Sequence, residues 1–293
     1  MISSRSLRAI LLAMLALCVG CAAHKADRPA AGSTRIAYGS DPSQQFGELF
    51  LPDGSGPFPL VVLIHGGCWL SRYGLDGTAP LSQALSHEGV AVWNIEYRRV
   101  GNPGGGWPGT FLDVADATDY ARTLAKKYPL DLSRTIVLGH SAGGHLALWD
   151  AARPKLAPSS ELYRQSPLPL RGAVAMAGPG DLRVLGRLGD GVCGRDTLYR
   201  LTGGTPVHVP EHYADGSPAA LLPLGLRQVL IVGSNDGIVP PGLVKDYLEA
   251  AKAAGDSVGY FELSGLNHLD PIDPGSKAWD TVRAQVLELV AKH

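Results

Sequence analysis

The sequence predicts an α/β protein with one large domain, in which a mainly parallel central sheet carries helices on both faces. Runs such as residues 60–64 and 228–233 are continuously apolar, as in strands that are buried on both sides of a parallel sheet. Segments with apolar residues at helical spacing alternate with these runs, which indicates right-handed crossovers between parallel strands. The length of 293 residues suits one such domain better than two small ones.

The elements follow the apolar runs and the turn residues between them. Strands are expected at residues 34–38, 45–51, 60–64, 90–95, 135–138, 172–177, 228–233 and 259–263. Helices are expected at residues 80–87, 111–128, 142–149, 243–254 and 277–292. Gly- and Pro-rich stretches at 52–59 and 101–109 predict loops. The segment 181–226, with many glycines and prolines, is expected to form a short lid over one end of the sheet and, with the loop at 101–109, to shape a pocket.

The N-terminal residues 1–21 have the pattern of an export signal. Arg5 and Arg8 precede an apolar run at 9–19 that is too short to span a bilayer. Cys21 follows Gly20, which resembles a bacterial lipoprotein signal cleaved before a cysteine that becomes lipidated. Ordinary cleavage near residues 22–23 or 30–31 is the alternative. We expect an exported protein, periplasmic or anchored to a membrane by lipidated Cys21, with a linker at 22–33.

The net charge, the cysteines and the absence of certain motifs limit which partners, metals and cofactors the sequence predicts. The net charge of −1 favours neither nucleic acid nor an anionic membrane surface. Cys68 and Cys193 remain after the signal; they could form a disulfide in an exported protein, but two buried, unpaired thiols are the slightly favoured expectation. No Cys/His cluster has zinc-ligand spacing, so no metal is expected. No G-x-G-x-x-G follows a strand and no G-K-[ST] occurs, so no cofactor is expected.

Residues 139–143 form the motif G-x-S-x-G around Ser141, between an expected strand and an expected helix. This arrangement is typical of a nucleophile elbow, a strained turn that raises a serine hydroxyl above the sheet. Gly139 and Gly143 flank the serine because strand and helix approach too closely there for a Cβ. A Gly-rich turn without function is the alternative in a chain with 37 glycines.

A serine nucleophile needs a general base and an acid that orients the base. Asp236 follows the strand at 228–233 and His268 follows the strand at 259–263, in the order Ser, Asp, His. Both therefore emerge with Ser141 at the carboxyl edge of the parallel sheet, where ligand sites form. Asp236 could instead cap the helix that begins near 240–241. Asp270 and Asp273 are rival acids, but they follow the base in the sequence.

The negative charge that builds on a substrate oxygen needs preorganised N–H donors. One donor is expected to be the main-chain N–H of Ala142, and the others those of Gly67 and Cys68 in H-G-G-C-W at 65–69. Cys68 is interpreted as a main-chain donor rather than as a nucleophile. His65 could be a second base, but a hydrogen bond within its own loop is the preferred interpretation.

These motifs resemble the α/β-hydrolase esterases. The resemblance is carried by the loop 65–69, the stretch N-I-E-Y-R at 94–98 and the elbow 139–143, and it covers residue 34 to the C-terminus. The feruloyl-esterase-like and kynurenine-formamidase-like branch is most similar; hormone-sensitive-lipase-like esterases carry a third glycine where this chain has Cys68. The resemblance implies an α/β-hydrolase catalytic domain at 34–293. It further implies hydrolysis of small or medium acyl or aromatic esters through an acyl-enzyme.

Three alternatives remain open. An arylformamidase would apply the same residues to an N-formyl amide, although export is unusual for that activity. A prolyl-oligopeptidase-type peptidase usually carries a large N-terminal propeller, for which this chain has no room. A catalytically idle binding module would typically lack the serine, the histidine or the acid, whereas Ser141, Asp236 and His268 are all present.

Overall fold

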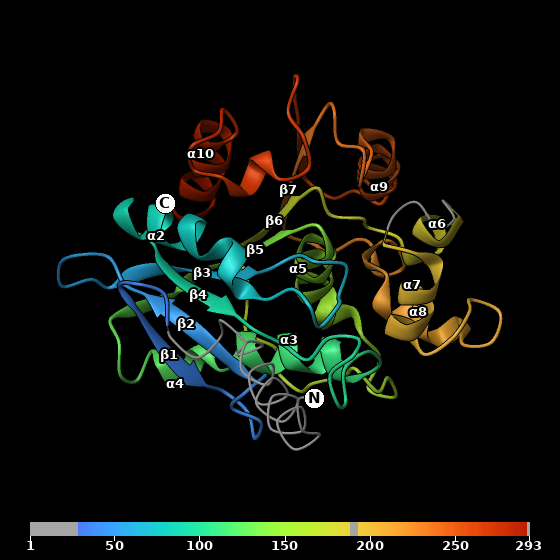
Figure 1. Cartoon of the computed structure of the whole chain (residues 1–293), viewed down its shortest axis with the longest axis horizontal. Coiled ribbons are helices and arrows are strands. Elements are labelled where there is room, and N and C mark those ends of the chain that lie inside the picture. The colour runs from blue at the N-terminus through green and yellow to red at the C-terminus, as the bar shows by residue number, and fades with distance from the viewer. Residues whose placement is uncertain (1–28, 188–192, 292–293) are drawn as a thin grey trace, which may run out of the picture.

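The central sheet of the molecule has eight strands (Figure 1). The computed structural model describes residues 29–187 and 193–291. The strands are β1 (Ser33–Ala37), β2 (Phe46–Phe50), β3 (Phe58–Ile64), β4 (Ala91–Ile95), β5 (Leu130–His140), β6 (Gly172–Met176), β7 (Arg227–Gly233) and β8 (Val258–Leu263). Their order is β1-β2-β4-β3-β5-β6-β7-β8, and all neighbours from β4 to β8 are parallel, whereas β2 is antiparallel to β1 and β4. The mainly parallel sheet is therefore confirmed.

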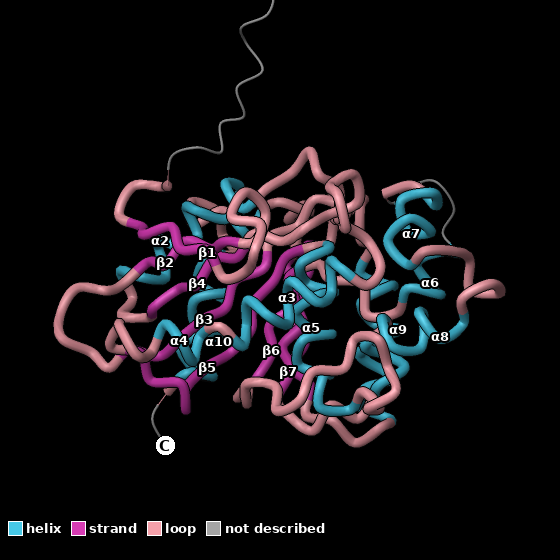
Figure 2. Tube along the Cα trace, turned by 90° about the horizontal axis from the view of Figure 1, so that it is seen from below, coloured by secondary structure: helices cyan, strands magenta, loops and turns pink. Residues whose placement is uncertain are grey.

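Helices cover both faces of this sheet (Figures 1 and 2). Side chains of a strand alternate between the faces. In β3, Val61 and Leu63 pack with residues of α2 (Ala79–His87) and α10 (Trp279–Val290). Leu60, Val62 and Ile64 share the opposite face with residues of α3 (Gly109–Asp119), α4 (Ala121–Leu124), α5 (Ala142–Ala152) and α9 (Pro241–Ala253). Burying each such side chain contributes about 1.5–3 kcal/mol.

The helix expected at 111–128 is interrupted. It forms α3 and α4, with Tyr120 between them. The chain tightens there, because the N–H of Thr123 bonds to the carbonyl of Tyr120 at 2.8 Å and that of Lys126 to Thr123 at 3.2 Å. These are three-residue spacings, as in a 3₁₀-helix. The strand expected at 135–138 begins earlier, at Leu130, with an irregular register against β3.

The segment 181–226 is more helical than its composition suggests. Its described part, residues 181–187 and 193–226, is called the cap segment below. It contains α6 (Leu182–Arg187), α7 (Arg195–Thr202), α8 (Pro210–Gly216) and a 3₁₀ turn, Pro218–Leu221. The cap segment lies beside α9, at one side of the sheet (Figure 1). The ring N–H groups of Trp149 and His145 on α5 donate to the carbonyls of Asp215 and Gly216, at 2.9 and 2.8 Å.

Several expectations concern residues that the structure does not describe. The signal peptide at 1–21, the lipidated Cys21 and most of the linker at 22–33 lie outside the described residues. Within residues 29–187 and 193–291, no helix is long and apolar enough to cross a membrane.

Candidate active site

Ser141 sits at a sharp turn between the end of β5 and the start of α5. Its backbone has φ 55° and ψ −120°, a conformation that non-glycine residues rarely adopt. A Cβ on Gly139 would lie 2.0 Å from the carbonyl oxygen of Gly143, and one on Gly143 would lie 2.0 Å from that of Ile64. The strained turn and the need for both glycines are therefore confirmed.

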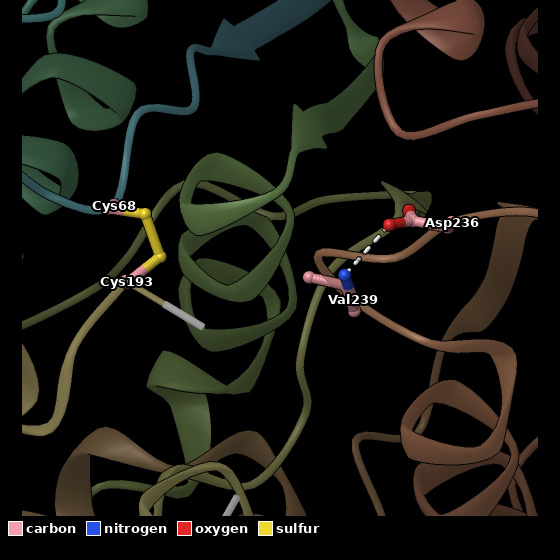
Figure 3. The surroundings of a disulfide bond; sticks show 4 residues. All are labelled: Cys68, Cys193, Asp236 and Val239. Carbon is pink, nitrogen blue, oxygen red and sulfur yellow. Dashed lines mark hydrogen bonds between the residues drawn. A yellow bond between two sulfur atoms is a disulfide. The ribbon is translucent and has the colours of Figure 1, made fainter. Parts of the chain in front are cut away.

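His268 and Asp236 come together at the same edge of the sheet. Nδ1 of His268 lies 2.7 Å from Oδ2 of Asp236, and since a carboxylate only accepts, the nitrogen donates. The other oxygen, Oδ1, accepts the N–H groups of Ile238 and Val239, both at 2.8 Å. Figure 3 shows the bond from Val239. Helix α9 begins later, after Pro240. Asp236 therefore fixes its own turn and the His268 ring, and it does not cap α9.

The surroundings of Asp236 keep its carboxyl group ionised. Burial alone raises the pKa of this group, but the hydrogen bonds from His268, Val239 and Ile238 together with the nearby histidine lower it, and the net pKa lies below the ordinary value. With Nδ1 of His268 donating to this carboxylate, the neutral ring carries its lone pair on Nε2. Nε2 is the atom that a general base would use.

The two rival acids bond elsewhere. Oδ2 of Asp270 accepts the main-chain N–H of Asn267 at 2.5 Å, and Oδ1 of Asp273 accepts that of Gly275 at 2.8 Å. In the described part of the chain, the carboxylate that bonds to the His268 ring is that of Asp236.

Ser141 and His268 line one cavity of about 480 Å³. Its walls carry the exposed hydrophobic side chains of Tyr73, Ile238 and Leu269, which are 45%, 42% and 62% accessible. The remaining lining residues are His65, Gly66, Gly67, Cys68, Arg72, Gly74, Asp76, Gly77, Thr78, His140 and Ile272. No group of three His, Cys, Asp or Glu side chains in residues 29–187 and 193–291 could hold a metal ion.

The expected pocket-forming segments do not line this cavity. Neither the cap segment nor the loop at 101–109 contributes a lining residue. The long connection after β3 reaches across the carboxyl edge of the sheet and takes that place instead, from His65 to Thr78. For the described residues 181–187, 193–226 and 101–109, the expectation that these segments shape the pocket is therefore wrong for this cavity.

The three expected N–H donors lie around Ser141. Ala142 is the first residue of α5, so no carbonyl of that helix can accept its N–H. Gly67 and Cys68 line the cavity with Ser141, at the end of β3. Gly67, Cys68 and Trp69 have φ angles of 110°, 54° and 54°. Left-handed backbone costs a non-glycine residue about 1–2 kcal/mol, so other contacts must hold this loop in place.

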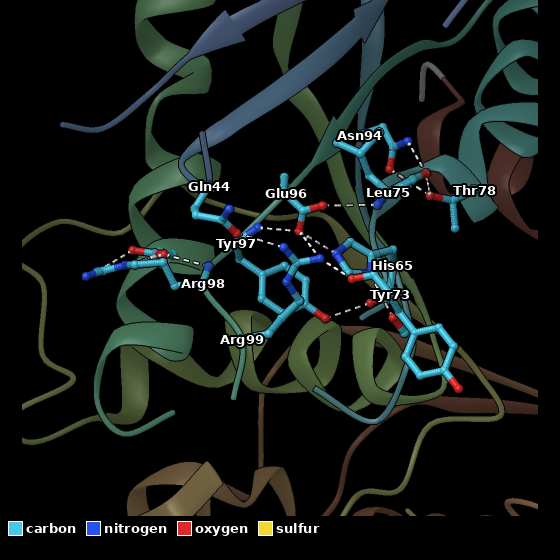
Figure 4. Close-up of polar contacts among 12 residues, drawn as sticks. Gln44, His65, Tyr73, Leu75, Thr78, Asn94, Glu96, Tyr97, Arg98 and Arg99 are labelled. Carbon is cyan, nitrogen blue, oxygen red and sulfur yellow. Dashed lines mark hydrogen bonds and ion pairs between the residues drawn. The ribbon is translucent and has the colours of Figure 1, made fainter. Parts of the chain in front are cut away.

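A buried acid, Glu96, bonds to His65 at the start of this loop (Figure 4). Glu96 Oε1 lies 2.8 Å from Nε2 of His65, while Nδ1 of His65 lies 2.7 Å from the carbonyl oxygen of Gly66. Glu96 also pairs with Arg99 at 3.0 Å and accepts the N–H of Leu75 at 3.2 Å. Burial raises the pKa of Glu96, but the charges of His65 and Arg99 lower it, so that it falls below its ordinary value.

His65 therefore bonds within its own loop, as the sequence predicts, and it is linked to the stretch N-I-E-Y-R through Glu96. Sequence reasoning named no role for Glu96. Glu96 directly follows an apolar strand and stands between Ile95 and Tyr97. This position predicts a buried carboxylate, which needs a charged or hydrogen-bonding partner.

Cys68 and Cys193 form a disulfide (Figure 3). Their Cα atoms lie 5.3 Å apart, although 125 residues separate them in the sequence. The expectation of two unpaired thiols is therefore wrong, because the path of the chain sets the Cα separation on which pairing depends. Cys68 has no thiol and cannot serve as a nucleophile in this state.

Comparison with known proteins places the chain among esterase-like sequences. The chain is 29% identical to the esterase LipC of Mycobacterium tuberculosis over 273 residues, which cover 88% of this chain and 65% of that protein. It is 26% identical to the isoprenylcysteine alpha-carbonyl methylesterase ICME of Arabidopsis thaliana over 251 residues, which cover 80% of this chain and 56% of that protein. The chain thus spans less than two thirds of the length of these relatives.

Solved structures share the fold. A truncated carbohydrate esterase from gut microbiota matches with a TM-score of 0.74 and 21% identity, over 90% of this chain and 99% of that one. A thermophilic esterase of Thermogutta terrifontis matches with a TM-score of 0.71 and 20% identity, over 89% and 94%. These likenesses show the α/β-hydrolase fold.

The BD-FAE family model matches residues 48–248, more than half of the chain, and the protein therefore belongs to the BD-FAE family.

Proposed function

We propose that this protein is a serine esterase that hydrolyses carboxylic esters through an acyl-enzyme. One observation carries the proposal: the strained Ser141 opens into the same cavity as His268, whose Nδ1 is bonded to Asp236 at 2.7 Å. A serine on such a turn, a base and an orienting acid are the three groups that acyl transfer needs. The esterases among the relatives support the same reaction.

In the proposed acylation, Oγ of Ser141 attacks the ester carbonyl while Nε2 of His268 takes its proton. The negative charge on the carbonyl oxygen is stabilised by the N–H groups of Ala142, Gly67 and Cys68. The ionised Asp236 stabilises the imidazolium that forms. His268 then gives the proton to the departing alcohol, the ester bond breaks, and the acyl group stays on Ser141.

Deacylation repeats these roles with water. His268 takes a proton from a water molecule, which attacks the acyl-enzyme, and the same N–H groups receive the new negative charge. When the bond to Oγ breaks, His268 returns the proton to Ser141. The carboxylic acid leaves, and the protein is restored without a cofactor.

The lining of the cavity favours small or medium acyl groups and aromatic substrates. Tyr73, Ile238 and Leu269 offer an aromatic ring and two aliphatic side chains, which suit apolar substrate groups. This agrees with the resemblance to the feruloyl-esterase-like branch, which we propose as the branch of this chain. The kynurenine-formamidase-like activity uses the same three residues on a formyl amide, and the assay below separates the two.

The test is hydrolysis of p-nitrophenyl esters from acetyl to octanoyl, methyl ferulate and N-formylkynurenine, by wild type and Ser141→Ala side by side. We expect turnover of short or aromatic esters that depends on Ser141. Selective turnover of the formyl amide would instead favour the arylformamidase. A folded wild-type protein that turns over none of these compounds would contradict the esterase and favour the binding module.

We also propose that the protein is exported and anchored through a lipid on Cys21. The support is the sequence alone: two arginines, a short apolar run and Gly20 before the cysteine. A single anchor of this kind would hold the domain at a membrane without a spanning helix.

A further inference from the structure

We propose that Cys193 is a positioning residue for the reaction: its disulfide with Cys68 holds the main-chain N–H groups that receive the substrate's negative charge. The redox state of this bond would then set the rate of the chemical step. The inference rests on the proposed acyl transfer at Ser141. It concerns a pair of cysteines that the proposed mechanism does not otherwise use.

The loop that carries Cys68 does not hold its shape by local preference. Three successive residues, Gly67, Cys68 and Trp69, have positive φ angles, and two of them are not glycine. Such a backbone persists only where surrounding contacts enforce it. The loop therefore depends on tethers to the rest of the molecule.

The first tether is Trp69, on the side away from the cavity. Its side chain is buried, with the ring edge-on to His145 at 5.4 Å between centroids. Its carbonyl accepts the N–H of Val100 at 2.8 Å. These contacts hold Trp69 in place. They do not involve Cys68, the residue before it.

The second tether is the disulfide, at Cys68 itself. Figure 3 shows the bond joining the loop after β3 to the segment that precedes α7. Helix α7 is packed against the rest of the domain, because its Leu198 and Leu201 side chains are buried in the hydrophobic cluster that also contains Val62. The bond thus connects the donor loop to a packed helix that lies 125 residues further along the chain.

Cys193 acts through Cys68 and not on the substrate. Cys68 lines the cavity beside Ser141, whereas no residue of the described cap segment does. Breaking the bond would leave the binding walls in place and loosen the N–H groups of Gly67 and Cys68. Because the substrate oxygen carries its negative charge only after attack, this loss should appear in kcat and not in KM.

The bond can be opened by an added dithiol, which supplies two electrons, and closed by an added disulfide, which takes them up. A thiolate of dithiothreitol attacks one sulfur, and its second thiol then releases the mixed disulfide. Two electrons and two protons pass to the thiols of Cys68 and Cys193, and dithiothreitol leaves as its cyclic disulfide. Oxidised glutathione reverses the change by forming the bond again and leaving two reduced glutathione molecules.

The experiment compares wild type with Cys193→Ser in the full-length protein, using p-nitrophenyl acetate. We expect kcat to fall about tenfold in the variant, less than the 10²–10³ of a lost donor, with KM within about twofold. Dithiothreitol should lower wild-type kcat to the same level, and oxidised glutathione should restore it. The double variant Cys68→Ser/Cys193→Ser, which carries no thiol at either position, should respond to neither reagent, and this control excludes effects at other cysteines.

Tyr213→Phe is the matched control for a merely structural role. The Tyr213 hydroxyl donates to the carbonyl of Gly204 at 3.0 Å and accepts from Thr202 at 3.1 Å, all within the cap segment. Its loss should lower the melting temperature and leave kcat unchanged. Wild-type kcat in Cys193→Ser, or a rise in KM alone, would overturn the proposal. Free thiols at both positions in a non-reducing peptide map would also overturn it.

Labelling of Ser141 by a fluorophosphonate separates this inference from the proposed function. The phosphoryl oxygen of the probe develops negative charge during attack and needs the same donors. We expect labelling of Cys193→Ser to be about tenfold slower than that of wild type. If wild type is labelled but hydrolyses no ester, the esterase proposal fails, while equal labelling rates in the two proteins would refute the tether.

Discussion

Nε2 of His140 lies 2.8 Å from the main-chain carbonyl oxygen of His268, and so joins the residue before the serine to the proposed general base. The two residues are 128 positions apart in the sequence. Burial, and then the neighbouring His268, lower the pKa of His140 to about 4. At neutral pH the ring is therefore uncharged. It donates through Nε2, and it places no second positive charge beside the ring that must accept a proton.

Removing this donor should misplace His268. His140→Phe keeps a ring of similar size but loses the N–H, and we expect kcat/KM to fall about tenfold, the equivalent of one hydrogen bond of roughly 1.4 kcal/mol. His140→Gln keeps an N–H donor and should recover part of the loss. Steady-state kinetics on the best ester of the panel measure both. Equal rates for wild type and His140→Phe would contradict the positioning role.

Ser141→Ala should lower ester turnover by roughly 10⁴-fold or more, because the acyl-enzyme can no longer form. The fold should survive, since Ser141 lines the cavity and alanine keeps the Cβ. Turnover and thermal unfolding measure the two effects. Ser264→Ala, at an exposed turn, is the control and should leave both unchanged. Near wild-type activity in Ser141→Ala would refute the mechanism.

Asp236→Asn tests the choice among the three acids. An amide can no longer stabilise the imidazolium or hold the same tautomer of His268, and kcat should fall by roughly 10⁴. Asp270→Asn removes a carboxylate that accepts the N–H of Asn267 and does not bond to the His268 ring in the described part of the chain, and should cost less than tenfold. The reverse ranking of these two variants in kcat would show that the acid is assigned wrongly.

Two buried histidines predict acid instability. Burial lowers the pKa of His145 to about 4, as it does for His140. Between this value and about 6.5, the unfolded chain binds a proton at each site and the native protein does not, so stability falls as the pH falls through this window. Each site should cost about 3 kcal/mol between neutral pH and pH 4.

His145 lies outside the cavity, so its contribution can be isolated. His145→Gln cannot take up the proton, and its free energy of unfolding in urea should change less between pH 7 and pH 4.5 than that of wild type. The variant loses some stability at pH 7 because the bond to the Gly216 carbonyl changes. A pH dependence as steep as that of wild type would show that His145 does not supply the effect.

The proposed anchor makes its own prediction. Cys21→Ala should move the protein from the membrane fraction to the soluble fraction, because the proposed attachment is the lipid on Cys21. Cell fractionation with an antibody against the folded domain measures the shift. Unchanged membrane association in this variant would count against lipidation at Cys21.

The strands of the sheet and the position of Ser141 at a strained turn can be predicted from the amino-acid sequence. Both depend on local patterns: apolar runs bounded by turn residues, and glycines at 139 and 143 where no Cβ fits. The sequence also predicts that Asp236 and His268 lie at one edge, because residues that follow parallel strands share that edge. Their contact at 2.7 Å follows from strand order as much as from residue type.

The other features of the site depend on contacts between segments that are far apart in the sequence. The disulfide between Cys68 and Cys193, the support of His65 by Glu96 and the bond from His140 to His268 join residues from distant parts of the chain. The cavity is likewise lined by the connection after β3 and not by the cap segment. Long-range contacts depend on the path of each loop across the sheet, and that path is set by the packing of the whole domain, which no local pattern encodes.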